Sequence, residues 1–148
     1  LLVELPEQCF IDITRLIQEV AELGVQVIVA HPERYIKILE KPKRLQNFIR
    51  FGGLLQVNGG SILGHFGKDV QKFAVQILEQ QLVHFVASDA HSPQSRPFVL
   101  KSVYKFLQDK LPEEYLKEVL FVNQEHIIRK KSLKPVMLRK VISSAPSR

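Results

Sequence analysis

The sequence has 148 residues, of which 45% are hydrophobic and 24% are charged, and its formal net charge is +6. This length suits one globular domain with a buried core, and no apolar run approaches the roughly 20 residues that span a bilayer. The positive charge is concentrated at one end, because residues 1–128 carry 14 Lys and Arg against 15 Asp and Glu. The body therefore lacks the basic face of a nucleic-acid-binding protein, and we expect no nucleic-acid partner.

Apolar runs that are typical of parallel strands covered on both faces occur four times. These runs are residues 1–5, 25–30, 54–57 and 82–87. Segments with apolar residues at helical spacing follow them. These segments are residues 13–23, the stretch from Pro42 to Gly52, and residues 70–81, 97–109 and 112–120. The stretch after Tyr35 is predicted to be irregular, and the pattern of residues 121–128 is ambiguous.

The first predicted helix illustrates the local signals. Asp12 is a residue type that caps helix N-termini, and Gly24 is the residue type that ends helices. Between them, Leu16, Val20 and Leu23 share one face at helical spacing, and we expect this face to point into the core.

Strand and helix alternate along the chain, which indicates an α/β fold with a parallel sheet. Parallel strands all end at one edge of the sheet, and the loops that follow them form the binding sites of such sheets and of β/α barrels. Four such units are about half of a barrel. Because the sequence starts inside a predicted strand, we expect it to be part of a longer barrel protein, with a small open sheet as the alternative.

Side chains of metal-binding type follow three of the four predicted strands. Glu4 ends the first, His31 follows the second, and Asp89 and His91 follow the fourth. Asp89 and His91 are two residues apart, so an extended strand end turns both side chains to one side. Carboxylate and imidazole groups suit manganese, iron or zinc. The sequence therefore predicts that these residues bind metal; the alternative is that they cap strand ends and hydrogen-bond within loops.

Two arginines accompany these residues. Arg34 lies three residues after His31, and Arg96 lies five after His91. Guanidinium groups bind phosphate through paired hydrogen bonds, so these arginines are candidates for holding a phosphate-bearing substrate. The alternative is that they form structural salt bridges, with Glu33 as a possible partner.

The other polar residues give weaker signals. His84 is an odd number of residues before Asp89, which predicts a packed histidine on the opposite face of the strand. His65, in a glycine-containing loop, is expected to lie near solvent, with an approach to a substrate as the less favoured interpretation, whereas His126 near the tail is expected to have no role. Residues 58–61 (Asn-Gly-Gly-Ser) could line the site, because glycine allows close backbone approach.

The cysteine content limits the chemistry further. The single cysteine, Cys9, excludes an internal disulfide and has no catalytic pattern around it, so we expect a reducing, cytoplasmic location. P-loop, Gly-x-Ser-x-Gly and Cys-x₅-Arg sequences are absent, which argues against a P-loop nucleotide site and against serine or cysteine nucleophiles.

Three segments carry a resemblance to a known family. They are His31-Pro32-Glu33-Arg34-Tyr35, residues 56–61 (Gln-Val-Asn-Gly-Gly-Ser) and residues 87–91 (Ala-Ser-Asp-Ala-His). Residues 1–128 resemble bacterial protein-tyrosine phosphatases of the PHP (polymerase and histidinol phosphatase) family, in which these segments occur in the same order. Those enzymes are manganese-dependent and belong to capsule and exopolysaccharide biosynthesis clusters. Residues 129–148 form a basic tail without a counterpart in the family.

The resemblance implies a PHP-type distorted β/α barrel, of which this chain supplies about half as the C-terminal part of the domain. It implies a multinuclear manganese centre at the strand ends, with iron or zinc as alternatives, and ligands at Glu4, His31, Asp89 and His91. It also implies that Arg34 and Arg96 bind the substrate phosphate and act in catalysis.

The family opens with an Asp-x-His-x-His motif, which this sequence lacks. We therefore expect the activity of these 148 residues alone to be incomplete. The expected substrate is phosphotyrosine on a bacterial tyrosine kinase that controls polysaccharide export. One alternative is a metal-dependent phosphoesterase acting on a small phosphate monoester, and another is an inactive remnant that only binds a partner. Exposed strand edges would favour self-association into a homo-oligomer.

Overall fold

A computed structural model describes residues 1–6, 9, 11–131 and 133. It contains one sheet of four parallel strands in the order β1-β2-β3-β4. The strands are β1 (Leu2–Val3), β2 (Ile28–Ala30), β3 (Leu54–Asn58) and β4 (Phe85–Ala87). Neighbours in the sheet are also neighbours in the chain, which is the strand order of a β/α barrel. The predicted α/β class with a parallel sheet is confirmed.

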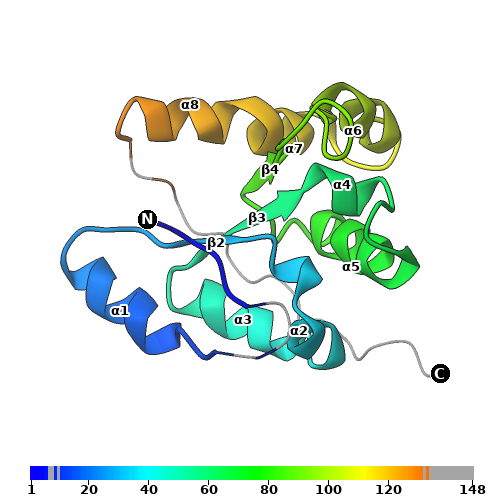
Figure 1. Cartoon of the computed structure of the whole chain (residues 1–148). Helices are drawn as coiled ribbons and strands as arrows, with labels where there is room; N and C mark the ends of the chain where they lie inside the picture. The colour runs from blue at the N-terminus through cyan, green and yellow to red at the C-terminus, as the bar shows by residue number, and fades with distance from the viewer. Residues whose placement is uncertain (7–8, 10, 132, 134–148) are drawn as a thin grey trace.

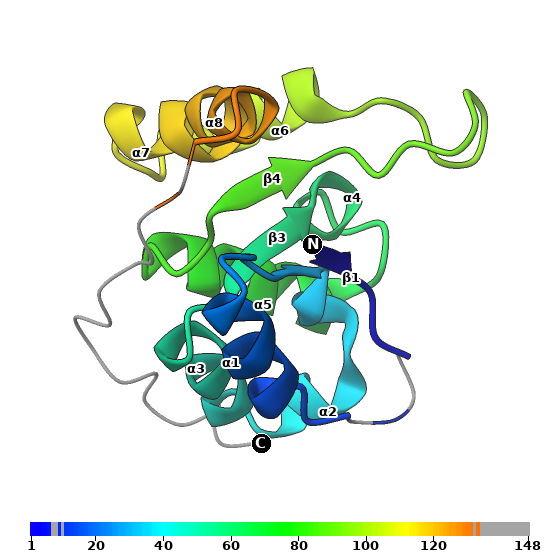
Figure 2. The same cartoon turned by 90° about the vertical axis from the view of Figure 1, so that its left-hand side faces the viewer.

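Helices connect the strands and continue beyond β4. They are α1 (Thr14–Glu22), α2 (Ile36–Glu40), α3 (Lys43–Arg50), α4 (Gly59–Ile62), α5 (Lys68–Glu79), α6 (Leu100–Leu107), α7 (Glu113–Lys117) and α8 (Asn123–Ile128), with a 3₁₀ turn η1 (Pro32–Arg34) and a π-helical turn η2 (Glu118–Val122). Figures 1 and 2 show α1, α2 and α3 grouped together, and α6, α7 and α8 grouped at the opposite end of the molecule, beyond β4.

The two faces of the sheet contact different clusters. Alternate strand residues such as Val29, Leu55 and Val86 belong to the main core, which also contains the buried side chains of the helices. On the other face, Leu54 and Phe85 pack with Leu133 in a smaller cluster, which Ile28 contacts. A sheet with apolar residues on both faces is expected of a β/α barrel, where one face is the interior.

The face of α1 that contacts the core differs from the prediction. Leu16 and Leu23 are 38% and 79% exposed, whereas Ile13 and Ile17 are buried. Apolar residues occur on several sides of this helix, so helical spacing alone offers two candidate faces, and the packing selects the one with Ile13 and Ile17. The predicted end of the helix is confirmed, because the N–H of Gly24 donates to the carbonyl of Ala21 and Gly24 has a φ of +74°.

Two segments have more helix than the sequence predicted. The stretch after Tyr35 contains α2, which at five residues is too short to show a helical period. Residues 121–128 continue from α7 through η2 into α8. Polar side chains hold this region against β4, since Asn123 donates to the carbonyl of His84 and Gln124 to that of Val86. Such long-range contacts leave no local signal in the sequence.

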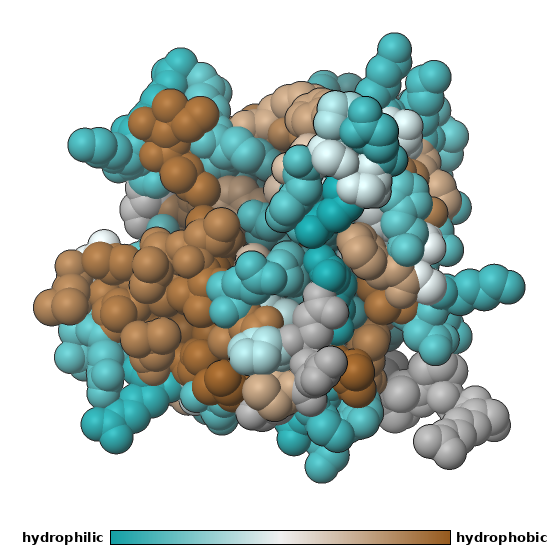
Figure 3. Space-filling model, in the orientation of Figure 1, coloured by the Kyte–Doolittle hydropathy of each residue, from teal (hydrophilic) through white to brown (hydrophobic). Residues whose placement is uncertain are grey.

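Apolar side chains are exposed at the free edge of the sheet. Leu1 and Leu2 are 59% and 58% exposed, and within the described part of the chain β1 pairs with β2 alone. Figure 3 shows a broad hydrophobic area over the side of the molecule where α1 and the N-terminus lie in Figure 1. This agrees with the predicted exposed apolar strand edge.

No helix among the described residues is long and apolar enough to cross a membrane. Most of the predicted basic tail, residue 132 and residues 134–148, lies outside the described residues.

Candidate functional site

The predicted functional residues lie at the carboxyl ends of the strands. Glu4 follows β1, His31 follows β2, and Asp89 follows β4. Asn58 ends β3 between them. Because the strands are parallel and in chain order, these positions share one edge of the sheet.

Glu4 and His31 form the first pair. Oε1 of Glu4 lies 3.1 Å from Nε2 of His31. Burial lowers the pKa of His31, and the charge of Arg34 lowers it further, against the smaller raising effects of Glu4 and Asp89. The imidazole is therefore held in its neutral form, which is the form that binds metal. Its buried Nδ1 atom has no hydrogen-bond partner.

Asp89 is the centre of a second cluster. Its Oδ2 atom forms an ion pair with Nη2 of Arg96, accepts a hydrogen bond of 2.8 Å from Nδ2 of Asn58, and lies 3.9 Å from Nη1 of Arg34. Its Oδ1 atom is 3.7 Å from Nδ1 of His91. Nη1 of Arg96 also lies 3.5 Å from Nε2 of His91. Both predicted arginines therefore converge on one carboxylate.

The backbone is strained at two of these residues. His31 and Asp89 have φ angles of +33° and +51°, in the left-handed region that costs a non-glycine residue about 1–2 kcal/mol. Strain of this kind is typical of functional sites, where surrounding contacts maintain it.

The predicted metal ligands form two pairs in this structure. Among the described residues, no group of three or more His, Cys, Asp or Glu side chains is placed to hold a metal ion. Glu4 with His31, and Asp89 with His91, each offer one carboxylate and one imidazole, which is the donor set that manganese, iron and zinc accept. The residues thus fit part of a metal shell, and their role as ligands stays a prediction.

Comparison with known proteins places this arrangement in a family. The family described as "Capsular polysaccharide synthesis, CpsB/CapC" matches residues 1–129. The chain belongs to the CpsB/CapC family. This confirms the resemblance proposed from the sequence segments.

Named relatives within CpsB/CapC are tyrosine phosphatases. The tyrosine-protein phosphatase YwqE of Bacillus subtilis (strain 168) is 34% identical over 123 residues, which are 80% of this chain and 48% of that protein. The tyrosine-protein phosphatase CpsB of Streptococcus agalactiae serotype III (strain NEM316) is 32% identical over 123 residues, or 80% of this chain and 51% of that protein. The chain thus spans about half the length of the curated relatives it matches.

A solved structure supports the same fold. It belongs to a study of YwqE from Bacillus subtilis and CpsB from Streptococcus pneumoniae, described as metal-dependent tyrosine phosphatases. The TM-score is 0.81 at 29% identity, and the match covers 90% of this chain and 56% of the other. The predicted PHP-type fold is therefore confirmed for the part of the fold that this chain contains.

Two residues of this chain that lie near the site, Glu33 and Phe66, were not among the predicted functional residues. Glu33 is completely buried, and its Oε1 atom accepts a hydrogen bond of 3.0 Å from the N–H of Asn58. Burial raises the pKa of Glu33 to about 7. The ring of Phe66 lies 4.2 Å from the guanidinium carbon of Arg34, a cation–π contact. The position of Glu33 inside the His-Pro-Glu-Arg-Tyr segment was a usable signal, whereas nothing in the sequence marked Phe66.

The remaining predictions for polar residues have clear outcomes. His84 is 3% exposed, its Nδ1 accepts a hydrogen bond from the N–H of Leu55, and burial lowers its pKa to about 4, so the predicted packed histidine is confirmed. A Cβ atom at Gly60 would lie 2.9 Å from Phe66 and 3.4 Å from His65, so the loop crosses close above this glycine. His65 therefore lies beside residues 58–61, next to the Asp89 cluster. Tyr35 packs in the core.

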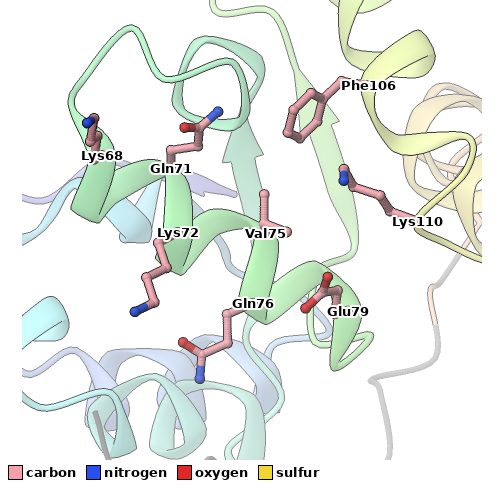
Figure 4. Close-up of a pocket in the computed structure, with 8 residues that line it drawn as sticks. All are labelled: Lys68, Gln71, Lys72, Val75, Gln76, Glu79, Phe106 and Lys110. Atoms are coloured by element: carbon pink, nitrogen blue, oxygen red, sulfur yellow. The ribbon is translucent and has the colours of Figure 1, made fainter. Parts of the chain in front are cut away.

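A groove elsewhere on the surface lies between α5 and α6. Lys68, Lys72, Val75, Phe106 and Lys110 are among its lining residues, as Figure 4 shows. None of the candidate site residues lines this groove.

Proposed function

We propose that this chain supplies the phosphate-binding residues and part of the metal shell of a metal-dependent protein-tyrosine phosphatase. The proposed substrate is phosphotyrosine on a bacterial tyrosine kinase that regulates capsule or exopolysaccharide synthesis. The observation that carries the proposal is the convergence of Arg34 and Arg96 on Asp89 at the strand ends. The names of the relatives support the reaction class.

The two arginines fit the chemistry of a phosphate monoester. Their guanidinium groups present N–H donors from two different loops, and Phe66 packs against one of them. A phosphoryl group entering between them would receive charge-assisted hydrogen bonds that strengthen as negative charge develops during transfer. Arg34 and Arg96 would thus both bind the substrate and act in catalysis.

Glu4, His31, Asp89 and His91 would hold the metal, for which manganese is proposed and iron or zinc are alternatives. A bound ion supplies polarisation of the phosphoryl group and lowers the pKa of a water molecule. The lowered pKa of His31 and the position of the Asp89 Oδ1 atom, 3.7 Å from Nδ1 of His91, suit this role.

We further propose that residues 1–128 form the C-terminal part of a phosphatase domain and residues 129–148 a basic tail. The proposed location is the cytoplasm, consistent with the single cysteine. A homo-oligomer is the proposed assembly, because the β1 edge is open and apolar.

The test is hydrolysis of a phosphotyrosine peptide by the natural protein with manganese, compared with Asp89→Ala and Arg96→Ala. Each variant should lower kcat/KM by about 10²-fold or more, since each removes charge at the reacting group. Arg15→Ala is the matched control, because the Arg15 side chain is 88% exposed and pairs with Glu19 on α1, away from the candidate site. Unchanged rates in both site variants would overturn the assignment.

Metal content gives a second readout. The purified chain, equilibrated with manganese and freed of excess ion, should retain it, and Asp89→Ala or His31→Ala should retain less. A chain that retains no manganese, iron or zinc would contradict the metal assignment.

A further inference from the structure

We propose that Asn58 and Glu33 are positioning residues that fix the orientation of the Asp89 carboxylate. Neither residue is among the predicted ligands or phosphate-binding residues. Their hydrogen bonds connect the loops that follow β2, β3 and β4. The effect on catalysis rests on the proposed phosphatase function, whereas the hydrogen bonds stand on the geometry alone.

The first step is the bond between Glu33 and Asn58. The ladder between β2 and β3 ends at the pair Ala30 and Gln56, because His31 turns the chain out of the sheet. The N–H of Asn58, two residues further along β3, then lacks a carbonyl partner from β2. Oε1 of Glu33 takes that place at 3.0 Å. Without it, this buried donor would be left unsatisfied, which is costly inside a protein.

The second step is the orientation of the Asn58 amide. Its Oδ1 atom accepts a hydrogen bond of 2.8 Å from the N–H of Gly60, which can only donate. The amide oxygen is therefore committed to the start of α4, and the NH₂ group must face the other way. There it donates to Oδ2 of Asp89 at 2.8 Å. Since Asn58 is 1% exposed, water does not compete for these groups.

The third step is the consequence for Asp89. The backbone of Asp89 is in the left-handed region, and its side chain is 22% exposed. The carboxylate therefore needs contacts from other residues to hold one orientation. The arginines that contact Oδ2 have long, flexible side chains, whereas Asn58 is short and buried. With Oδ2 held by Asn58, Oδ1 faces His91. A small displacement of the carboxylate would misplace both arginines, and misplacement by about 1 Å can cost 10²-fold in rate.

The direct test is NMR spectroscopy of the ¹⁵N-labelled 148-residue chain without metal. The side-chain amide of Asn58 is assigned by the loss of its signals in Asn58→Asp, or in Asn58→Ser should the first variant fail to fold. We expect these signals to exchange slowly with solvent, and to shift and exchange quickly in Asp89→Ala. Signals of Asn47, which is exposed on α3, serve as the internal control. Asn58 signals that are unchanged in Asp89→Ala would overturn the proposal.

Glu33 is tested with two substitutions. Glu33→Gln keeps an oxygen acceptor for the N–H of Asn58, so the Asn58 amide signals should stay near their wild-type positions. Glu33→Ala removes the acceptor and should shift them. Equal spectra for both variants would remove Glu33 from the proposal.

The kinetic arm compares Asn58→Asp with Asn47→Asp, which changes the net charge equally. Asn58→Asp places a carboxylate against that of Asp89, and should lower kcat/KM on a phosphotyrosine peptide by about 10- to 100-fold. Asn47→Asp should leave it within about twofold. A folded Asn58→Asp protein with wild-type kinetics would overturn the positioning role. If the wild-type protein hydrolyses no phosphotyrosine, the proposed function fails, and the NMR result alone decides the role of Asn58.

Discussion

At the scale of single residues, the candidate site brings two guanidinium groups to one carboxylate. Asp89 lies between the guanidinium groups of Arg34 and Arg96. Paired hydrogen bonds from a planar guanidinium suit the oxygens of a phosphate, so the shape of the arginine side chain matters as well as its charge.

Arg96→Lys separates shape from charge. Lysine keeps the positive charge but loses the forked donors, so kcat/KM on a phosphotyrosine peptide should fall by about tenfold or more. Arg129→Lys is the control, because Arg129 is largely exposed and pairs with Glu125 on α8. Steady-state kinetics would measure this, and a kcat/KM for Arg96→Lys equal to that of the wild-type protein would show that the paired guanidinium donors are not needed.

His84 makes stability depend on pH. Its pKa is about 4 in the folded protein, because of burial, against 6.5 in an unfolded chain. Below pH 6.5 the unfolded state gains the proton first, so the free energy of unfolding should fall by about 3 kcal/mol as the pH drops from 6.5 to 4. Above pH 6.5 this contribution is fully present.

The measurement is urea denaturation at several pH values for the wild-type chain and for His84→Gln, which keeps an acceptor for the N–H of Leu55. Glu33 changes stability in the opposite direction, because burial raises its folded pKa to about 7, so its contribution falls as the pH rises from 4.5 to 7. Both proteins contain Glu33, so the difference between their free energies of unfolding isolates the effect of His84. A difference that is constant from pH 7 to pH 4 would contradict this prediction.

At the scale of elements, α4 connects β3 to the groups that surround the site. It starts at Gly59, directly after Asn58, and packs against α6. A Cβ atom at Gly59 would lie 2.9 Å from Cγ2 of Val99 and 3.1 Å from Cγ2 of Val103. The absence of a side chain thus lets α4 approach α6 closely, which keeps Asn58 and the loop of residues 63–67 in place.

Gly59→Ala should therefore destabilise the chain by about 1–3 kcal/mol, as expected for overpacking against branched side chains. Chemical denaturation would measure the change. Adding Val99→Ala should recover part of the loss, because it removes the nearest atom, and the two changes should not be additive. Ser102→Ala on the exposed side of α6 is the control. Additive effects of Gly59→Ala and Val99→Ala would show that the steric explanation is wrong.

At the scale of the whole molecule, the sheet has an open edge. β1 has a partner on one side only, and Leu1 and Leu2 beside it are exposed. Unpaired strand groups next to exposed apolar side chains are a template for association with another chain. The CpsB/CapC relatives are about twice as long as the matched segment, so their folds contain further elements.

We predict that the 148-residue chain self-associates with increasing concentration and that Leu2→Lys weakens this association. A lysine on an edge strand opposes pairing with a second strand. Sedimentation velocity or light scattering over a range of concentrations would measure it. Phe98→Lys, a change at another exposed apolar residue outside the sheet, should leave the association unchanged. A wild-type chain that stays monomeric at all concentrations would contradict the prediction.

The sequence by itself determined the α/β class, the alternation of strands and helices along the chain, and the placement of Glu4, His31 and Asp89 at strand ends. These properties depend on local signals: apolar runs of strand length, glycines that end helices, and the rule that parallel strands end at one edge. The buried environment of His84 also followed from the alternation of side chains along a strand.

Only the tertiary structure decided which side chains meet. The face of α1 was ambiguous because the helix has apolar residues on several sides, and the buried face was the one the core could accommodate. The pairing of Glu33 with Asn58, of Asn58 with Asp89, and of Phe66 with Arg34 joins residues from 25 to 32 positions apart or on separate loops. Hydrogen bonds and ring contacts of this kind depend on distances in space, and a one-dimensional pattern of residue types contains no record of them.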